Sequence, residues 1–318
     1  MSEADVLELL PMDTAIECVE ASFRAQHQDA VNHPRRRIFL PHISLHYMAA
    51  ALPGQNLAGL KIYTVSREMF RFVVLLFEAE RGELLAMIEA DHLGRLRTGA
   101  ASGIATKYLS LPEASHAGVI GAGRQARTQL EAISFVRPIR EARVFSRDEN
   151  RRKAFCCEMS SRLRLTVEPA ESAEAAARFG DVVITATSAR EPVLFGEWLQ
   201  PGAHVNAIGA NMHNRREVDD GLLHRAAVIA VDSLEQAKME SGDLIQGFAG
   251  EPKRWDNVGE LHEIIAGSRP GRTSAKDVTL FKSAGIALWD VAAAGAIYHR
   301  AVELGRGKEI TLTPEILS

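Results

Sequence analysis

The sequence predicts an α/β protein in which a doubly wound parallel sheet follows a smaller α+β region. After Pro112, short apolar runs alternate with helical stretches, as they do in parallel sheets with helices on both faces. Before Pro112, two apolar runs flank a short turn through Gly82, which is typical of an antiparallel hairpin. The length of 318 residues also suits two domains. We therefore expect one domain at 1–112 and a second at 113–289.

The first region mixes helical and strand patterns. Thr14 and Glu17 match a capping box, and Ile16, Val19 and Phe23 follow at helical spacing, so we expect a helix that begins at Thr14. The other elements expected here are an extended basic segment at 33–37, strands at 60–65, 72–77 and 84–88, and a helix at about 93–109.

The second region predicts the parallel sheet. Ligands of such sheets bind at the carboxyl ends of the strands, so polar residues that follow a strand are candidates for the site. A long apolar helix is expected at 285–304. The expected strands are Ala117–Gly121, Ala142–Ser146, Leu165–Val167, Asp181–Thr187, His204–Gly209 and Val228–Asp232.

The composition excludes several classes of protein. Thirty-seven basic and 41 acidic residues give a net charge of −4, so charge offers no reason to expect nucleic acid or an anionic membrane as a partner. The cysteines, Cys18, Cys156 and Cys157, are odd in number, and no spacing suggests a metal site. No long apolar run and no basic, apolar leader occurs. We expect a cytoplasmic protein without a metal.

A glycine-rich turn carries most of the functional information. Gly121-Ala122-Gly123-Arg124-Gln125-Ala126 follows an apolar strand and opens a helix, which is the GxGxxA form of the Rossmann dinucleotide fingerprint. Gly121 permits the tight turn, Gly123 lets the backbone approach a pyrophosphate, and Ala126 lets helix and strand pack closely. The alternative is an ordinary glycine turn, but the strand before and the helix after favour a site for NAD or NADP.

The end of the next expected strand bears on the choice of cofactor. An acidic residue there usually binds the ribose 2′-hydroxyl of NAD, whereas an arginine accepts the 2′-phosphate of NADP. Ser146 and Arg147 favour NADP, and Asp148 lies one or two residues late for the NAD role. The alternative is that Arg147 is a solvated loop residue.

A series of further short segments is more specific than the fold. They are Arg97–Ser102, Val119–Ala126, Thr185–Ser188, Glu191–Leu194, Pro201–Ala210, Arg216–Asp219, Val231–Ser233, Gly242–Leu244 and Thr279–Ser283. With these segments in this order, the chain from about Arg36 to its C-terminus resembles the ornithine cyclodeaminase/mu-crystallin family.

The resemblance implies an architecture and an activity. It implies a homodimer in which the N-terminal domain binds substrate and dimerises, and to which residues 290–318 return after the Rossmann domain. It also implies hydride transfer, with NAD or NADP, at a carbon that bears both nitrogen and a carboxylate. The implied cofactor contacts, beyond the glycine turn, Ser146 and Arg147, are Thr98, Thr187, Ser188, Gly209, Asn211 and Ser283.

Three cations are candidates for binding the carboxylate of an imino- or amino-acid substrate. Arg97 matches the arginine with which the family binds the carboxylate, although by itself it would pass for a surface arginine on a helix. Lys61 matches a lysine that contacts the substrate, and desolvation would lower its pKa and suit it to donate a proton. Arg36 matches a further arginine, but the run 35–37 leaves the register ambiguous.

Asn211 is a departure from the resembling cyclodeaminases and alanine dehydrogenases, which carry an aspartate at this position. An aspartate can deprotonate an amine or activate water, and an asparagine cannot. As a candidate catalytic residue, Asn211 therefore favours a reductase of imines over a cyclodeaminase. The nearby His213 and Asn214 are alternatives, and the imidazole of His213 could supply a proton.

Arg71 is a second departure, in a loop where many members of the family have small or polar residues. Together with the run at 35–37, it suggests spare cations for a second carboxylate, and hence a dicarboxylic imine such as iminosuccinate. Two other hypotheses remain open: a cyclodeaminase of ornithine with tightly bound NAD, and a non-enzymatic NADPH-binding protein like mu-crystallin.

Overall fold

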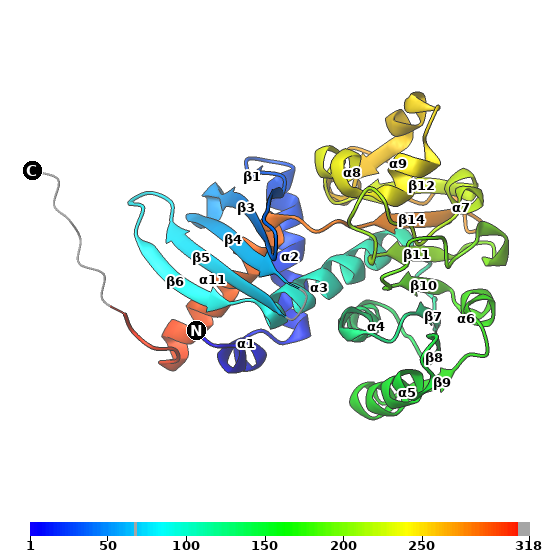
Figure 1. Ribbon diagram of the computed structural model, residues 1–318, viewed down its shortest axis with the longest axis horizontal. Coiled ribbons are helices and arrows are strands. Elements are labelled where there is room, and N and C mark those ends of the chain that lie inside the picture. The colour runs from blue at the N-terminus through cyan, green and yellow to red at the C-terminus, as the bar shows by residue number, and fades with distance from the viewer. Residues whose placement is uncertain (67–68, 311–318) are drawn as a thin grey trace, which may run out of the picture.

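The computed structural model describes residues 1–66 and 69–310, and within them the chain forms two sheets joined by helix α3 (Asp91–Leu109) (Figure 1). The first sheet is antiparallel, with the order β1-β3-β4-β5-β6 and β2 paired to β3. Its strands are β1 (Val31–Asn32), β2 (Arg36–Phe39), β3 (Ser44–Leu52), β4 (Leu57–Val65), β5 (Phe70–Glu78) and β6 (Leu84–Glu89). The expected hairpin, β5–β6, is confirmed.

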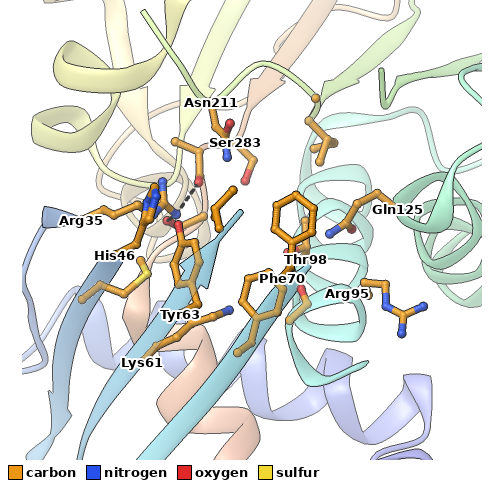
Figure 2. A pocket seen from close by; sticks show the side chains of 18 of the residues that line it. Arg35, His46, Lys61, Tyr63, Phe70, Arg95, Thr98, Gln125, Asn211 and Ser283 are labelled. Carbon is orange, nitrogen blue, oxygen red and sulfur yellow. Dashed lines mark hydrogen bonds between the residues drawn. The ribbon is translucent and has the colours of Figure 1, made fainter. Parts of the chain in front are cut away.

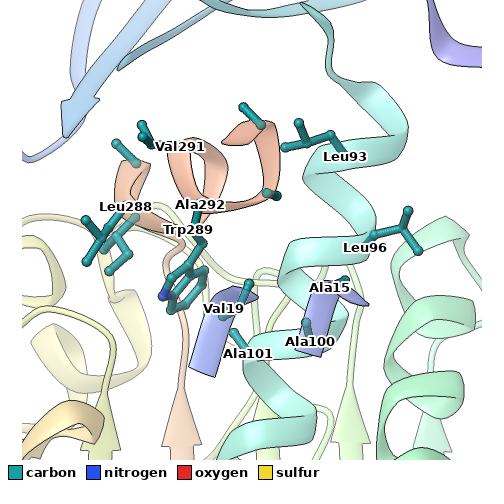
Figure 3. Close-up of a cluster of buried hydrophobic side chains, with 14 of the residues drawn as sticks. Ala15, Val19, Leu93, Leu96, Ala100, Ala101, Leu288, Trp289, Val291 and Ala292 are labelled. Atoms are coloured by element: carbon teal, nitrogen blue, oxygen red, sulfur yellow. The ribbon is translucent and has the colours of Figure 1, made fainter. Parts of the chain in front are cut away.

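Helices cover one face of this sheet. They are α1 (Glu3–Leu9), α2 (Met12–Gln26), α3 and the C-terminal α11 (Ala287–Leu304), with a 3-10 turn η1 (Pro53–Gln55) between β3 and β4. Side chains from α2, α3 and α11 pack together in the core shown in Figure 3. In the same hydrophobic cluster, the rings of Phe23 and Trp289 lie 5.3 Å apart. The backbone of β4 approaches α11 so closely that a Cβ on Gly59 would lie 2.8 Å from Val291.

The expected start of the first long helix is wrong. Helix α2 begins at Met12 after Pro11, and no side chain caps it; Thr14 lies inside the first turn. Pro11 has the extended backbone of an N-cap residue, so the chain enters the helix two residues before the apparent capping box. A capping box does occur at α1, where Ser2 and Asp5 bond each other's backbone N–H groups.

The second sheet is parallel throughout, with the order β13-β12-β14-β11-β10-β7-β8-β9. Its strands are β7 (His116–Ile120), β8 (Glu141–Phe145), β9 (Thr166–Pro169), β10 (Val182–Thr185), β11 (His204–Ala207), β12 (Ala226–Val231), β13 (Val258–Glu260) and β14 (Val278–Lys282). The six strands expected from the sequence are present, and β13 and β14 were missed. Strand β13 has only three residues, and β14 inserts between β11 and β12, far from both in sequence.

Helices flank both faces of this sheet, as in a doubly wound fold (Figure 1). They are α4 (Arg124–Val136), α5 (Glu149–Leu163), α6 (Ala173–Phe179), α7 (Asp220–Arg225), α8 (Leu234–Glu240), α9 (Gly242–Gly247) and α10 (Leu261–Ile265), with 3-10 turns η2 (Gly196–Trp198) and η3 (Pro252–Asn257). Helix α11 then packs on the first sheet. We infer the two domains expected from the sequence, with the return beginning at Ala287; residues 311–318 of the expected return lie outside the described residues.

The described residues form the ranges 1–66 and 69–310. They contain no helix that is both long and apolar enough to cross a bilayer. They also contain no cluster of three or more His, Cys, Asp or Glu side chains with the spacing of a metal site.

Candidate active site

A cavity of about 500 Å³ lies where the first sheet meets the carboxyl ends of the parallel strands (Figure 2). This is the edge at which ligands bind in doubly wound sheets. One wall is the helix-covered face of β3, β4 and β5, and the opposite wall is formed by the loops that follow β10, β11 and β14 and by the start of α4.

The glycine turn that follows β7 has the geometry needed to hold a pyrophosphate. Gly121 has φ +114°, which L side chains rarely adopt, and a Cβ there would lie 2.4 Å from the carbonyl oxygen of Ala186. Gly123 is the N-cap of α4, and a Cβ there would meet nothing within 4 Å, so open space remains for a ligand. Ala126 is completely buried against the sheet. The residues present therefore fit a dinucleotide.

Most of the other expected cofactor residues lie around the cavity. Those that line it are Thr98, Gln125, Thr187, Gly209, Asn211 and Ser283. Ala122 lies within the turn, Arg124 forms an exposed ion pair with Asp91, and Ser188 is exposed beside the cavity, where its carbonyl accepts a bond from Arg215.

Asp148 and Arg147, at the end of β8, are the two residues between which the sequence left the choice of NAD or NADP open. Asp148 is the N-cap of α5, and its carboxylate accepts a bond from the N–H of Arg151, 3.0 Å away. Ser146 donates a hydrogen bond to the carbonyl of Asp148, and Arg147 is exposed at the strand end. The carboxylate of Asp148 is therefore engaged in capping, whereas the guanidinium of Arg147 remains accessible.

The deepest part of the cavity contains two cations that share one carboxylate. Lys61 Nζ on β4 lies 2.7 Å from Asp290 Oδ1, and Arg97 Nε on α3 lies 3.0 Å from the same oxygen. Lys61 is 3% exposed, Arg97 6% and Asp290 0%. Burial, and secondarily the charge of Arg97, lower the pKa of Lys61 to about 8, against the opposing attraction of Asp290. Two positive charges and one negative charge leave an excess of one positive charge at this position.

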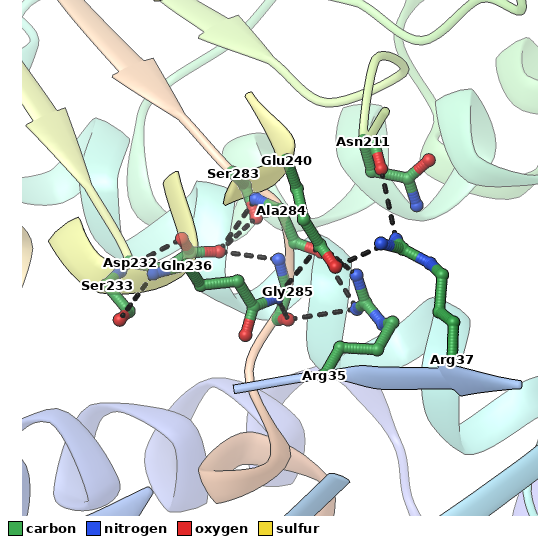
Figure 4. A network of polar contacts seen from close by, with 10 residues as sticks. All are labelled: Arg35, Arg37, Asn211, Asp232, Ser233, Gln236, Glu240, Ser283, Ala284 and Gly285. Carbon is green, nitrogen blue, oxygen red and sulfur yellow. Dashed lines mark hydrogen bonds and ion pairs between the residues drawn. The ribbon is translucent and has the colours of Figure 1, made fainter. Parts of the chain in front are cut away.

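A second cluster contains Arg35 and Arg37, not Arg36. Arg35 forms an ion pair with Glu240 and donates to the carbonyls of Ala284 and Gly285, and Arg37 pairs with Glu240 at 2.8 Å (Figure 4). Arg36 lies in β2 between them and is exposed. The expectation that Arg36 faces the substrate is therefore corrected, because successive side chains of a strand point to opposite faces and a shift of one residue exchanges them.

The expectation that Arg71 binds the substrate is also corrected, because its side chain lies on the other face of the sheet. It pairs with Thr64 on the face of the sheet that points away from the cavity, and it is exposed. Its neighbours Phe70 and Phe72 line the cavity instead. The sequence placed Arg71 in a loop, where the side-chain direction is open, but it lies in β5, where the direction is fixed.

Asn211 lies at the mouth of the cavity, in the loop after β11. Its side chain is exposed, and its backbone carbonyl accepts a bond from Arg37 at 3.3 Å. His213 is exposed farther along the same loop and does not line the cavity.

Sequence reasoning missed the acidic partners of these cations. Asp290 lies on the expected C-terminal helix, where a single acid in an apolar stretch was the available signal. Glu240 lies at the end of α8 and is 1% exposed. His46, on β3, also lines the cavity and belongs to a strand that was not expected.

A third acid, Glu217, holds two of the cavity loops. It is completely buried, and its carboxylate accepts bonds from the N–H and hydroxyl of Thr187, the hydroxyl of Thr185 and the N–H of Gly209, at 2.5–3.0 Å. Thr185 ends β10, and Thr187 and Gly209 belong to the loops after β10 and β11. Burial raises the pKa of Glu217, and Lys282 opposes the shift.

The fold and the site define a protein with an antiparallel sheet, a parallel Rossmann sheet and a buried cationic pocket at the carboxyl edge of the latter. The chain belongs to the ornithine cyclodeaminase/mu-crystallin family, whose sequence model matches residues 1–305.

Relatives of known structure or name are similar over most of the chain. The Thermococcus litoralis Δ1-pyrroline-2-carboxylate reductase, solved with NADH and L-proline, is 35% identical, with a TM-score of 0.93 over 98% of this chain and 99% of that one. The alanine dehydrogenase of Archaeoglobus fulgidus is 35% identical over 98% of this chain and 97% of its own. The mouse ketimine reductase mu-crystallin is 39% identical over 71% of this chain and 68% of its own.

Proposed function

We propose that the protein is an NAD(P)H-dependent reductase of 2-imino acids that acts in reverse as an amino-acid dehydrogenase. The observation that carries the proposal is the buried pair of Lys61 and Arg97 on one carboxylate, in a cavity that also reaches the dinucleotide turn. The names of the three relatives describe oxidoreductases of amino or imino acids. The reduced nicotinamide supplies a hydride to the imine carbon when it is bound.

Arg97 is proposed to bind the substrate carboxylate. Its Nε is occupied by Asp290, while its buried Nη1 has no hydrogen-bond partner within residues 1–66 and 69–310. A buried, unpaired N–H costs free energy, and a carboxylate would satisfy it with a charge-assisted bond. The excess positive charge shared by Lys61, Arg97 and Asp290 matches a single carboxylate.

Lys61 is proposed to give the proton to the substrate nitrogen. A donor with a pKa near the working pH is both protonated and able to release its proton, and the pKa of Lys61 is lowered to about 8. Asp290 holds the ammonium in place, and Gly94 opposite leaves room for a substrate, because a Cβ there would lie 3.1 Å from Nζ.

Asn211 supports reduction over cyclodeamination. An amide cannot take a proton from an amine, so the loop after β11 offers no general base at this position. The cyclodeaminase and the non-enzymatic binder are therefore the alternatives against which the proposal is tested.

NADPH is the proposed cofactor, on the strength of Ser146 and Arg147 at the end of β8. Arg147 is exposed, and a guanidinium binds a phosphate with paired bonds. We expect Arg147→Ala to raise the KM for NADPH by about tenfold, the loss of one charge-assisted bond, and to leave the KM for NADH unchanged. Equal effects on both cofactors would contradict the assignment.

A homodimer is proposed because the face of the first sheet opposite the helices is apolar. Leu60 pairs with Leu75 there, and Ile62 pairs with Val73, and all four are partly exposed. Figure 1 shows no described helix over this face. An apolar face of this kind marks an association site, and Arg36 and Arg71 lie on it.

The decisive experiment follows the loss of NADPH or NADH with a panel of imines: pyrroline-2-carboxylate, piperideine-2-carboxylate, and the imines made from pyruvate or oxaloacetate with ammonia. We expect oxidation of the cofactor by at least one imine, loss of that activity by more than a hundredfold in Lys61→Met, and no change in the control Arg140→Gln, at an exposed arginine that does not line the cavity. Ammonia release from ornithine without net oxidation would favour the cyclodeaminase, and cofactor binding without turnover would favour the binder.

A further inference from the structure

A second polar position lies one layer nearer the cavity mouth than Lys61. In the first sheet Met48 pairs with Lys61, and His46, two residues along β3, pairs with Tyr63 and with Arg37 of β2. Paired residues share a face, and so do residues two apart on one strand. His46 and Arg37 therefore face the same cavity as Lys61, about 7 Å farther along the strand direction.

His46 has a ring nitrogen that is free to bind a ligand. The residue is 6% exposed, its Nε2 lies 2.7 Å from Ser44 Oγ, and its Nδ1 has no hydrogen-bond partner in the described part of the chain. Burial and the charges of Arg37 and Arg35 lower the pKa of His46 to about 4, so the ring is neutral near pH 7. When the Ser44 hydroxyl donates to Nε2, Nδ1 carries the proton and becomes a donor.

Arg37 adds charge beside this ring. Glu240 fixes its guanidinium through Nη2 at 2.8 Å, while the buried Nε has no partner among the described residues. Glu240 is shared with Arg35, and Asp232, drawn in the same network in Figure 4, accepts bonds from the Ser283 hydroxyl and from the N–H groups of Ala284 and Gly285. The unpartnered Nε of Arg37 and Nδ1 of His46 are donors separate from those of Lys61 and Arg97. Figure 2 shows His46 and Arg35 across the cavity from Gln125, which lies beside the dinucleotide turn.

We propose that His46 and Arg37 bind a second carboxylate, carried by the side chain of the substrate, so that the preferred substrate is a short 2-imino dicarboxylic acid. The inference rests on the proposed function, in which Arg97 and Lys61 hold the first carboxylate. It restores the dicarboxylic hypothesis on residues other than Arg71, which faces away from the cavity.

The test compares kcat/KM for the imine of oxaloacetate with that for the imine of pyruvate, which lacks the second carboxylate. His46→Phe keeps a ring to stack on Tyr63, whose centroid is 4.5 Å away, and removes the nitrogen donor. We expect the wild type to prefer the dicarboxylic imine. We also expect His46→Phe and Arg37→Gln to lower its kcat/KM by about 10- to 100-fold and that of the pyruvate imine by less than about threefold. Arg140→Gln, at an exposed arginine that does not line the cavity, is the control for the loss of one positive charge.

Preference for the pyruvate imine, or equal losses on both imines, would overturn the inference while leaving the reductase intact. If no imine is reduced, the proposed function fails instead, and binding then tests the second position directly. With saturating NADP⁺, L-aspartate should bind the wild type at least tenfold more tightly than L-alanine in calorimetry. His46→Phe should remove that difference, and its absence in the wild type would also overturn the inference.

Discussion

Replacing Asp290 by asparagine tests how the buried acid controls Lys61. The ammonium of Lys61 lies 2.7 Å from Asp290, and the lysine is buried. At an effective dielectric constant of about 20, two charges at that separation attract by roughly 6 kcal/mol. This energy corresponds to about 4 pKa units, which is the upper limit for the effect of Asp290 on the pKa of Lys61. Measured shifts from one opposite charge are about 1–3 units.

We therefore expect the Lys61 pKa to fall from about 8 to about 5–7 in Asp290→Asn. The proposed reaction needs a protonated Lys61, so activity is lost as the pH rises through this pKa. The alkaline limb of the kcat/KM profile for imine reduction should move to lower pH by the same 1–3 units. Asp290→Glu keeps the charge and should move the limb much less.

A second buried ion pair distinguishes a general loss of stability from a specific effect of Asp290 on the pKa of Lys61. Lys282 and Asp243 lie 3.1 Å apart, are both completely buried and do not line the cavity. Breaking either pair by removing its acid should cost about 3–5 kcal/mol of unfolding free energy, measured by denaturant titration. Asp243→Asn should leave the alkaline limb in place, and an unshifted limb in Asp290→Asn would refute the reasoning.

Three further predictions concern the cofactor turn, acid stability and assembly. Gly123→Ala should weaken cofactor binding in fluorescence titration without lowering the melting temperature, whereas Gly121→Ala, at φ +114°, should also cost about 1–3 kcal/mol of stability. His204 is completely buried, and burial lowers its pKa from 6.5 to about 3, so stability should fall as the pH drops below about 6.5. Between pH 6.5 and 5 the unfolding free energy should lose about 2 kcal/mol on this account, and His204→Gln should lose less. Ile62→Arg, on the apolar sheet face, should give monomers in sedimentation velocity, and an unchanged mass would contradict the proposed homodimer.

Local sequence signals were sufficient where the structure is itself local. The GxGxxA turn, the β5–β6 hairpin and six parallel strands depend on neighbouring residues, and they were predicted correctly in kind. The start of α2 failed because two signals compete within four residues, and Pro11 ends the extended segment before Thr14 can act as a cap.

Side-chain direction was the information that the sequence lacked at the site. Arg36 was expected beside the substrate from a segment of ambiguous register, and Arg71 from a loop, but both lie in strands and point away from the cavity. Because side chains alternate along a strand, an error of one residue in the expected register exchanges cavity and solvent. Arg35 and Arg37, from the run whose register the sequence left ambiguous, line the cavity instead of Arg36.

The sequence by itself determined the class of fold, the dinucleotide turn and the two principal cations, Lys61 and Arg97. Only the tertiary structure decided what those cations touch. Asp290 lies 229 positions from Lys61, and Glu240 lies 205 from Arg35. No periodic pattern links residues so far apart; the folding of α11 and α8 against the first domain brings each acid to its cations. Burial likewise depends on the tertiary structure, because it arises where the two sheets meet at the cavity. It lowers the pKa of Lys61 and leaves Nδ1 of His46 without a partner among the described residues.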